Sequence, residues 1–176
     1  LTMSLHCLLI RSRGKTILVD TGLGSRLTQD EHDRWAVERP SGGLIESLAR
    51  AGVSPEDVDV VVNTHLHWDH CGGNTRWVEG RLKATFPRAQ YWVQRMEWAD
   101  ASHPDARTRG TYLPDNFAPL EESGQLVLLH GDAAVTDQVR CVVTRGHTRA
   151  HQSVLIQAGP WQGMFVADMA SFGVHL

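Results

Sequence analysis

Residues 63–75, NTHLHWDHCGGNT, bring together side chains of the types that bind metal ions. His65 and His67 alternate with other residues, so in an extended segment both imidazoles lie on the same side. Asp69 and His70 follow directly. Neutral imidazole and carboxylate are preferred ligands of catalytic zinc, which keeps one coordination position open for water. Four such ligands exceed what one open tetrahedral site needs, so the cluster indicates two metal ions side by side.

The elements around this cluster indicate an α+β architecture. The run VDVVVNT at 58–64 is short and nearly all apolar, which is typical of a strand buried on both faces, and the histidines begin where it ends. In chain order, the other predicted elements are a hairpin of 5–11 and 15–20 that turns at Arg13-Gly14, a helix in 41–52, a strand at 90–93, short helices at 94–101 and 114–123, and four strands after Gly124. We therefore expect sheets covered by helices, with the chemistry in loops at strand ends.

Two further candidate ligands lie in loops that follow later strands. The segment VVTRGHT places His147 after a predicted strand and a glycine, and MFVAD places Asp168 at the end of the next strand but one. A histidine at a turn or an aspartate at a strand end usually makes local hydrogen bonds. Because both follow the first cluster in order and lie at strand ends, we interpret them as metal ligands.

The motifs T-H-L-H-W-D-H-C-G-G (64–73), G-H-T (146–148), A-D (167–168) and D-T-G (20–22) together resemble the metallo-β-lactamase superfamily of metal-dependent hydrolases, and the resemblance covers nearly the whole chain. It implies an αββα sandwich with metals at one edge between the two sheets. The implied roles are a first zinc held by His65, His67 and His147, a second zinc to which Asp69 and His70 contribute, Asp168 as the bridge, and Asp20 behind the ligands, where it orients an imidazole.

The sequence departs from the family pattern in three ways. The family motif G-H-T-P-G-H is G-H-T-R-A-H here (146–151), and we interpret His151 as structural. Ser171 stands where quorum-quenching lactonases of the family carry a catalytic tyrosine. The family supplies a later histidine to the second metal, whereas this sequence ends at Leu176 and His175 is expected to line the pocket. We expect one domain, 1–176, truncated at both ends and lacking its C-terminal part, with a weak second zinc site.

The ligands imply hydrolytic chemistry. Two zinc ions close together lower the pKa of a shared water to roughly 7, which supplies hydroxide at neutral pH, and they polarise the oxygen under attack. Asp69 is the candidate catalytic residue, because a carboxylate held there can position the hydroxide or pass a proton to the leaving group. No serine or cysteine nucleophile is needed, and Cys71 is interpreted as helix packing.

The substrate class follows from a second resemblance. Residues 77–98 and 111–120 resemble the branch that contains lactonases and methyl parathion hydrolase-like enzymes, which implies a small ester, lactone or organophosphate. The predicted pocket residues are Trp68, Ser171 and His175. Five aromatic residues either form an apolar wall of the pocket or belong to the protein core: Trp68, Trp77, Trp92, Trp98 and Phe117.

Composition excludes several classes of partner. The formal net charge is −3 over 176 residues, and no apolar run is long enough to cross a bilayer, so neither nucleic acid nor a membrane is expected as a partner. The basic residues between 76 and 95 are interspersed with Glu79 and Glu97, which is typical of a solvated face. The odd number of widely spaced cysteines predicts a reducing, cytoplasmic compartment. The expected partner is a small-molecule substrate.

Three alternatives stay open at this point. A glyoxalase II-like thioester hydrolase would share the ligand set. A nuclease of the same superfamily is disfavoured, because those enzymes add a substrate-gripping domain or a basic arm. A non-catalytic metal-binding remnant would keep the ligands without a complete site, and metal analysis with a turnover assay would distinguish it.

Overall fold

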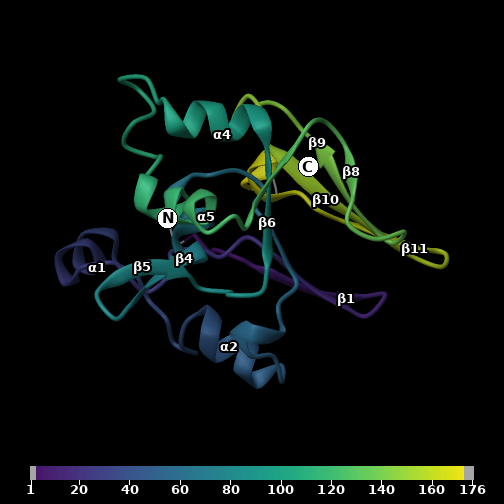
Figure 1. The fold of residues 1–176 in the computed structure, drawn as a ribbon, viewed down its shortest axis with the longest axis horizontal. Coiled ribbons are helices and arrows are strands. Elements are labelled where there is room, and N and C mark those ends of the chain that lie inside the picture. The colour runs from purple at the N-terminus through teal and green to yellow at the C-terminus, as the bar shows by residue number, and fades with distance from the viewer. Residues whose placement is uncertain (1–2, 173–176) are drawn as a thin grey trace.

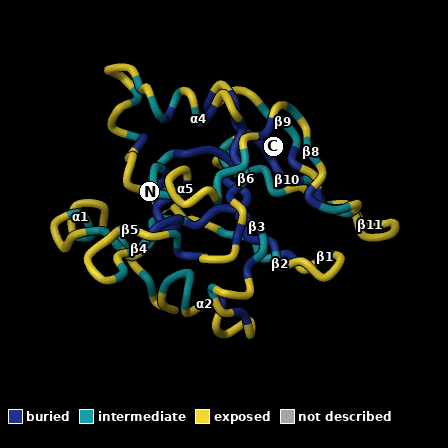
Figure 2. Tube along the Cα trace, viewed as in Figure 1, coloured by how far each residue is buried: buried dark blue, intermediate teal, exposed yellow. Residues whose placement is uncertain are grey.

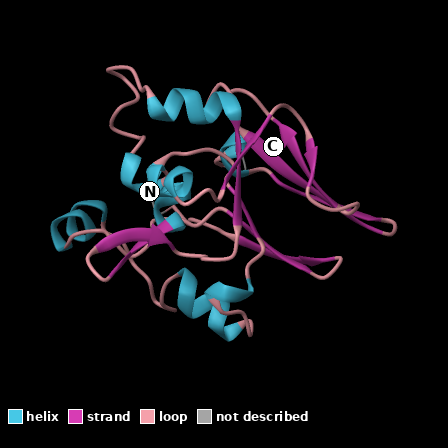
Figure 3. Cartoon of the chain, viewed as in Figure 1, coloured by secondary structure: helices cyan, strands magenta, loops and turns pink. Residues whose placement is uncertain are grey.

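Two β-sheets lie face to face, and α-helices cover the outer face of the first (Figures 1 and 3). The computed structural model describes residues 3–172. The strands are β1 (Leu8–Ser12), β2 (Lys15–Val19), β3 (Val60–Val62), β4 (Thr75–Val78), β5 (Arg81–Ala84), β6 (Gln90–Gln94), β7 (Leu126–Leu129), β8 (Ala133–Ala134), β9 (Val139–Val143), β10 (Gln152–Ala158) and β11 (Trp161–Phe165). The α-helices are α1 (Gln29–Trp35), α2 (Leu44–Arg50), α3 (Trp68–Cys71), α4 (Arg95–Ser102) and α5 (Ala118–Glu122). Short 3₁₀ turns occupy Pro55–Asp57, Gly72–Asn74, Pro114–Asn116 and Ala167–Ala170.

The first sheet has the order β1-β2-β3-β6-β7. β1 and β2 form an antiparallel hairpin, and β2, β3, β6 and β7 run parallel to one another. Val60, Val61 and Val62 are all buried, as expected for a strand covered on both faces. Because parallel strands end at the same edge of a sheet, the loops after β2 and β3 emerge side by side.

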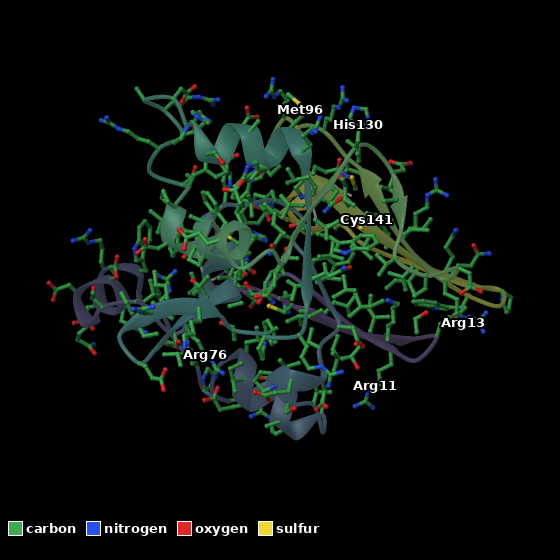
Figure 4. All side chains as sticks on the ribbon, in the orientation of Figure 1. Arg11, Arg13, Arg76, Met96, His130 and Cys141 are labelled. Atoms are coloured by element: carbon green, nitrogen blue, oxygen red, sulfur yellow. The ribbon has the colours of Figure 1, made fainter. Side chains whose placement is uncertain are left out.

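The second sheet, β11-β10-β9-β8, is antiparallel throughout. Its inner face contributes Cys141 and Val154 to a core shared with Ile17 and Val62 of the first sheet. Figure 4 shows Cys141 in this interior, and Figure 2 shows that the buried residues gather between the layers. The sheets therefore pack as the two central layers of a sandwich.

The opposite face of the first sheet packs against helices. Leu18 and Tyr91 from the sheet lie in one cluster with Leu48 of α2, Ala101 of α4 and Leu120 of α5. Burial of each leucine in this cluster stabilises the fold by roughly 1.5–3 kcal/mol relative to exposure. Residues 3–172 contain no helix that is long and apolar enough to span a membrane.

Hydrogen bonds join the two sheets at both ends. At one end, Arg13 in the β1–β2 turn pairs with Asp137 at 2.7 Å, and Arg13 lies near the tips of both sheets in Figure 4. At the other end, Gln152 at the start of β10 donates its backbone N–H to the Thr64 carbonyl at 2.9 Å and its side-chain amide to the Asn63 carbonyl at 2.8 Å. The second junction fixes the strand ends that carry the histidines.

Most sequence-based elements are confirmed. The hairpin turns at Arg13-Gly14, and the helix expected in 41–52 is α2. The helix expected at 114–123 is divided into a 3₁₀ turn and α5. The α+β fold class is also confirmed, whereas the single-domain boundary 1–176 stays a prediction.

Two side-chain assignments, those of Glu97 and Trp77, are wrong. Glu97 does not lie on a solvated face, because its position on α4 turns it inward and leaves it 1% exposed. Trp77 forms neither wall nor core, because β4 directs it outward and it is 61% exposed. Trp98 and Phe117 pack against each other in the helical core, with ring centroids 5.4 Å apart.

Candidate metal centre

The loop after β3 carries the first group of histidines. β3 ends at Val62, the chain stays extended through His65 and His67, and α3 begins at Trp68. The His65 and His67 ring centroids lie 4.6 Å apart, and the His65 and His70 centroids 4.2 Å apart. The alternation of side chains in the extended segment, followed by one helical turn, therefore brings the three imidazoles together.

Two glycines let this loop approach the loop after β2. A Cβ atom at Gly72 would lie 2.6 Å from the carbonyl oxygen of Leu23, which is closer than real contacts allow. At Gly73 it would collide with the Thr21 backbone. The close approach permits hydrogen bonds such as Thr21 N–H to the His70 carbonyl at 2.8 Å. The Gly-Gly pair thus places the residues after β2 directly behind α3.

The second sheet adds His147 and Asp168 from the loops that follow β9 and β11. The Nε2 atom of His147 lies 3.0 Å from Nδ1 of His67. One oxygen of Asp168 lies 3.2 Å from Nε2 of His147, and the other lies 3.3 Å from Nε2 of His70. Asp168 therefore stands between the two groups of histidines.

These side chains form two overlapping sets of potential ligands in the described residues. One set is His65, His67 and His147, and the other is His65, His70 and Asp168; in each, the ligand atoms lie within 4.8 Å of one another. Asp69 belongs to neither set, although its Oδ2 is 3.7 Å from Nε2 of His70. The structure thus brings the six sequence-predicted ligands to one place, and their coordination of metal stays a prediction.

A hydrogen-bond network fixes which nitrogen two of the histidines present. Asp20 accepts from Nδ1 of His70 at 2.9 Å and from the Thr64 hydroxyl at 2.7 Å. Because that hydroxyl donates to Asp20, its oxygen accepts from Nδ1 of His65, 3.1 Å away. Both histidines consequently direct Nε2 toward the cluster. Residues that hydrogen-bond to metal-ligating histidines commonly orient the imidazole in this way.

The donor set fits divalent metal ions. The Nε2 atom of His65 is buried without a hydrogen-bond partner in the described part of the chain, and Nε2 of His70 has the Asp168 carboxylate 3.3 Å away. An orphaned group such as Nε2 of His65 costs about 1–3 kcal/mol unless a partner binds it. His67 and His147 turn two nitrogen atoms toward each other at 3.0 Å, an arrangement that a shared cation or proton stabilises.

The electrostatics separate the two sets. Burial, reinforced by His147 and His70, lowers the pKa of His67 to about 4, and burial likewise lowers the pKa of His65. At His70 burial also lowers the pKa, but Asp168 and Asp20 outweigh it and raise the pKa to about 10. In the metal-free protein His65 and His67 are therefore neutral imidazoles, whereas His70 holds a proton.

Other predicted residues lie at or near the centre. The Nδ1 atom of His151 is 2.8 Å from the Thr144 hydroxyl, and this residue belongs to neither ligand set. Cys71 is fully buried, with Sγ 3.2 Å from the Leu66 carbonyl, so it packs within α3 as expected. Ser171 is exposed after the Ala167–Ala170 turn, and His175 lies outside the described residues.

A cavity of about 400 Å³ adjoins α3. Its lining includes Trp68, Leu23, Leu27 and Leu113, with Arg26 among the polar groups. None of the six candidate ligands lines it. Trp68, which lines the cavity, stands between His67 and Asp69 in sequence.

Sequence reasoning missed residues that support the loops. Thr64 lies inside the histidine motif, yet its hydroxyl role was not recognised. Glu97 accepts hydrogen bonds from Leu66, Tyr112 and Thr148, which border both ligand loops. An acidic residue beside Trp98 and Ala101 on a short helix was the available signal, and it was too weak to indicate burial.

A family comparison agrees with this geometry. Residues 4–173 match the family model described as the metallo-beta-lactamase superfamily. The chain belongs to the metallo-β-lactamase superfamily.

Curated relatives are lactonases. An N-acyl homoserine lactonase from Bacillus sp is 30% identical over 167 residues, which cover 89% of this chain and 60% of the relative. The N-acyl homoserine lactonase AttM from Azorhizobium caulinodans is 29% identical over 166 residues, covering 85% and 58%. The chain thus spans about six tenths of the length of these relatives.

Solved structures show the same fold. A probable metal-dependent hydrolase from Staphylococcus aureus superposes with a TM-score of 0.81 at 26% identity, covering 91% of this chain and 56% of that one. The dizinc quorum-quenching lactonase AidC, solved with the product N-hexanoyl-L-homoserine, has a TM-score of 0.70 at 25% identity, covering 92% and 55%. These likenesses confirm the predicted metallo-β-lactamase sandwich.

Proposed function

We propose that this chain is the metal-binding part of a hydrolase that uses two zinc ions to open small lactones. The observation that carries the proposal is the pair of ligand sets that share His65, with ligand atoms within 4.8 Å. His65, His67 and His147 would hold one ion, while His70 and Asp69 would hold the other and Asp168 would bridge them. Imidazole and carboxylate donors favour zinc over magnesium or calcium.

The proposed chemistry divides between metal and protein. Zinc ions at these ligands would lower the pKa of a bound water and polarise the carbonyl oxygen under attack. Asp20 and Thr64 hold the imidazoles of His70 and His65 in the tautomers that ligation needs. These residues orient ligands and do not touch the substrate.

Asp69 is the proposed proton carrier. Its side chain is 32% exposed at the cluster, so it is accessible from the open side of the site. A carboxylate positioned beside the reacting groups can accept a proton and return it. It would take a proton from the attacking water and deliver it to the alkoxide oxygen that leaves when the ring opens.

The lactone class is supported by the relatives and by the cavity. The curated relatives are N-acyl homoserine lactonases, and AidC was solved with the product N-hexanoyl-L-homoserine. In this chain, Leu23, Leu27, Trp68 and Leu113 form an apolar part of the lining of the cavity beside α3, and this part suits an acyl chain; Arg26, Glu31, Asp115 and Asn116 form the polar part. We therefore propose a lactone that carries an apolar acyl substituent.

A panel of substrates tests this proposal. The zinc-loaded protein would be assayed with N-hexanoyl-homoserine lactone, S-lactoylglutathione and a dialkyl aryl phosphate. We expect the lactone to have the highest kcat/KM, and Asp168→Ala to lower it by roughly 10²-fold or more while the circular dichroism spectrum is retained. Preference for the thioester would indicate the glyoxalase II-like alternative, and a zinc-loaded protein inactive on all three would indicate a non-catalytic metal-binding remnant.

A further inference from the structure

We propose that Glu97 is a positioning residue that sets the placement of His67 and His147 relative to each other. The inference rests on the proposed metal-binding function. Glu97 lies in the first turn of α4 and is 1% exposed. Its Oε1 accepts from the Leu66 backbone N–H at 3.0 Å and from the Tyr112 hydroxyl at 3.1 Å. Its Oε2 accepts from the Thr148 hydroxyl at 2.6 Å.

These contacts reach both loops that carry the first ligand set. Leu66 stands between His65 and His67 in the loop after β3, and Thr148 follows His147 in the loop after β9. One carboxylate therefore joins ligand loops that belong to different sheets. Because Leu66 and Thr148 both donate to Glu97, a change in Glu97 alters the position of one loop relative to the other rather than one loop alone.

Tyr112 adds a contact to His67 itself. Its ring centroid lies 5.1 Å from that of His67, and its hydroxyl is held by Glu97. The neighbouring carbonyl of Thr111 accepts from the Trp68 backbone N–H at 2.9 Å. Residues 111–112 thus contact His67 and the residue that follows it, whereas Leu66 precedes it. Glu97 anchors this segment through the Tyr112 hydroxyl.

A carboxylate suits this position because its two oxygens accept from several donors at once. Hydrogen bonds to an ionised acceptor are shorter and stronger than neutral ones, and the contact to Thr148 is among the shorter ones here. Burial raises the pKa of Glu97, opposed by the three hydrogen bonds. Divalent ions on the adjacent histidines would supply compensating positive charge.

The same helix holds the His147 loop at a second point. Asp100, one turn after Glu97 on α4, accepts from the Arg149 guanidinium through both oxygens, at 2.6 and 2.9 Å. Arg149 occupies the position where the family motif carries proline. In this chain, α4 thus contacts Thr148 and Arg149, the two residues that follow His147. His147 itself is exposed, so its own loop does not bury it.

The test removes single hydroxyls that bind Glu97. Tyr112→Phe and Thr148→Val each delete one donor without adding bulk. Tyr91→Phe is the matched control for the first, because the Tyr91 hydroxyl is buried and bonds to Phe86 and Asn74, away from Glu97. Thr75→Val is the control for the second, because the buried Thr75 hydroxyl donates to the Asp115 carbonyl at 2.7 Å.

The readouts are zinc affinity, measured by competition with a chromophoric chelator, and the absorption spectrum of the cobalt-substituted protein. We expect Tyr112→Phe and Thr148→Val to weaken the tighter zinc site about 10-fold and to alter the cobalt spectrum, since partners behind metal ligands typically contribute 10–100-fold. The two controls should keep affinity and spectrum even where they lower the melting temperature equally.

Two substitutions of Glu97 itself separate hydrogen bonding from folding. Glu97→Leu removes all acceptors, and we expect a loss of roughly 100-fold in zinc affinity. Glu97→Gln should recover most of it, because the amide oxygen can accept from Leu66 and Tyr112 while the amide nitrogen donates to Thr148. If Glu97→Leu fails to fold, the hydroxyl variants still decide the question.

The outcomes distinguish this inference from the proposed function. If the parent binds zinc and the two hydroxyl variants match their controls in affinity and cobalt spectrum, the positioning role of Glu97 is refuted and the metal site stands. If the folded parent binds no metal, the proposed function is overturned, and the inference falls with it.

Discussion

Asp20 and His70 are joined by a 2.9 Å contact between Oδ2 and Nδ1, although they are 50 residues apart in sequence. The same carboxylate accepts from the backbone N–H and the hydroxyl of Thr64, whose oxygen is 3.1 Å from Nδ1 of His65. One buried aspartate therefore orients an imidazole in each ligand set. Its backbone φ of +56° turns the chain after β2 so that the side chain reaches both.

Replacing this aspartate should weaken metal binding without unfolding the protein. In Asp20→Asn the uncharged amide accepts hydrogen bonds less strongly, so the tautomers of His65 and His70 are no longer enforced. We expect zinc affinity to fall by about 10–100-fold, measured by chelator competition. Asp59→Asn is the control, because Asp59 accepts a backbone N–H from Thr16 at 2.8 Å and makes no contact with the histidines. Equal affinity in the two variants would contradict the orienting role.

Zinc titration should proceed in two steps that differ in pH dependence. The first set offers imidazoles such as His67, whose pKa of about 4 leaves it neutral at pH 7. His70 has a pKa of about 10 in the metal-free protein, so the second ion must displace a proton. The second step should therefore be weaker and should tighten by about 10-fold per pH unit as the pH rises from 6 to 8.

Calorimetry in buffers of different ionisation enthalpy would measure the protons released in each step. The expected result is about one more proton released in the second step than in the first near pH 7. Equal zinc affinities with the same pH dependence in both steps would show that the His70 proton does not weaken binding of the second ion. The Asp69→Ala variant should lose affinity in the second step and retain the first.

Trp68 should control the response to acyl-chain length. It lines the cavity beside α3 and packs against Trp35 with ring centroids 5.4 Å apart. Trp68→Ala should raise KM for a decanoyl lactone more than for a butanoyl lactone, because the longer chain loses more apolar contact. Trp77→Ala is the control, since Trp77 is 61% exposed on β4. A uniform change across chain lengths in Trp68→Ala would remove the acyl chain from this cavity.

The sequence sufficed for the parts of the site that depend on local chemistry. Because β3 is a continuous apolar run, its end and the following histidines could be located without knowledge of the fold. His147 and Asp168 could be placed at strand ends for the same reason. Their approach to within 3.2 Å depends on how the two sheets pack, which only the resemblance to the family had implied.

The residues behind the ligands could not be found in this way. The contacts of Glu97 with Leu66 and Thr148 span 31 and 51 residues, so its burial depends on long-range packing. Helix α1 was also missed, because it buries none of its residues and shows no apolar periodicity. A local signal for it was the Thr28–Glu31 capping box.

The metal content of the folded chain tests the central claim most directly. After dialysis from excess zinc, elemental analysis of the parent would be compared with His67→Ala and with His130→Ala, whose exposed histidine lies at the periphery in Figure 4. We predict that the parent and His130→Ala retain zinc, with up to two ions per chain, whereas His67→Ala retains less. A folded parent that retains no zinc and binds none on titration would contradict the account.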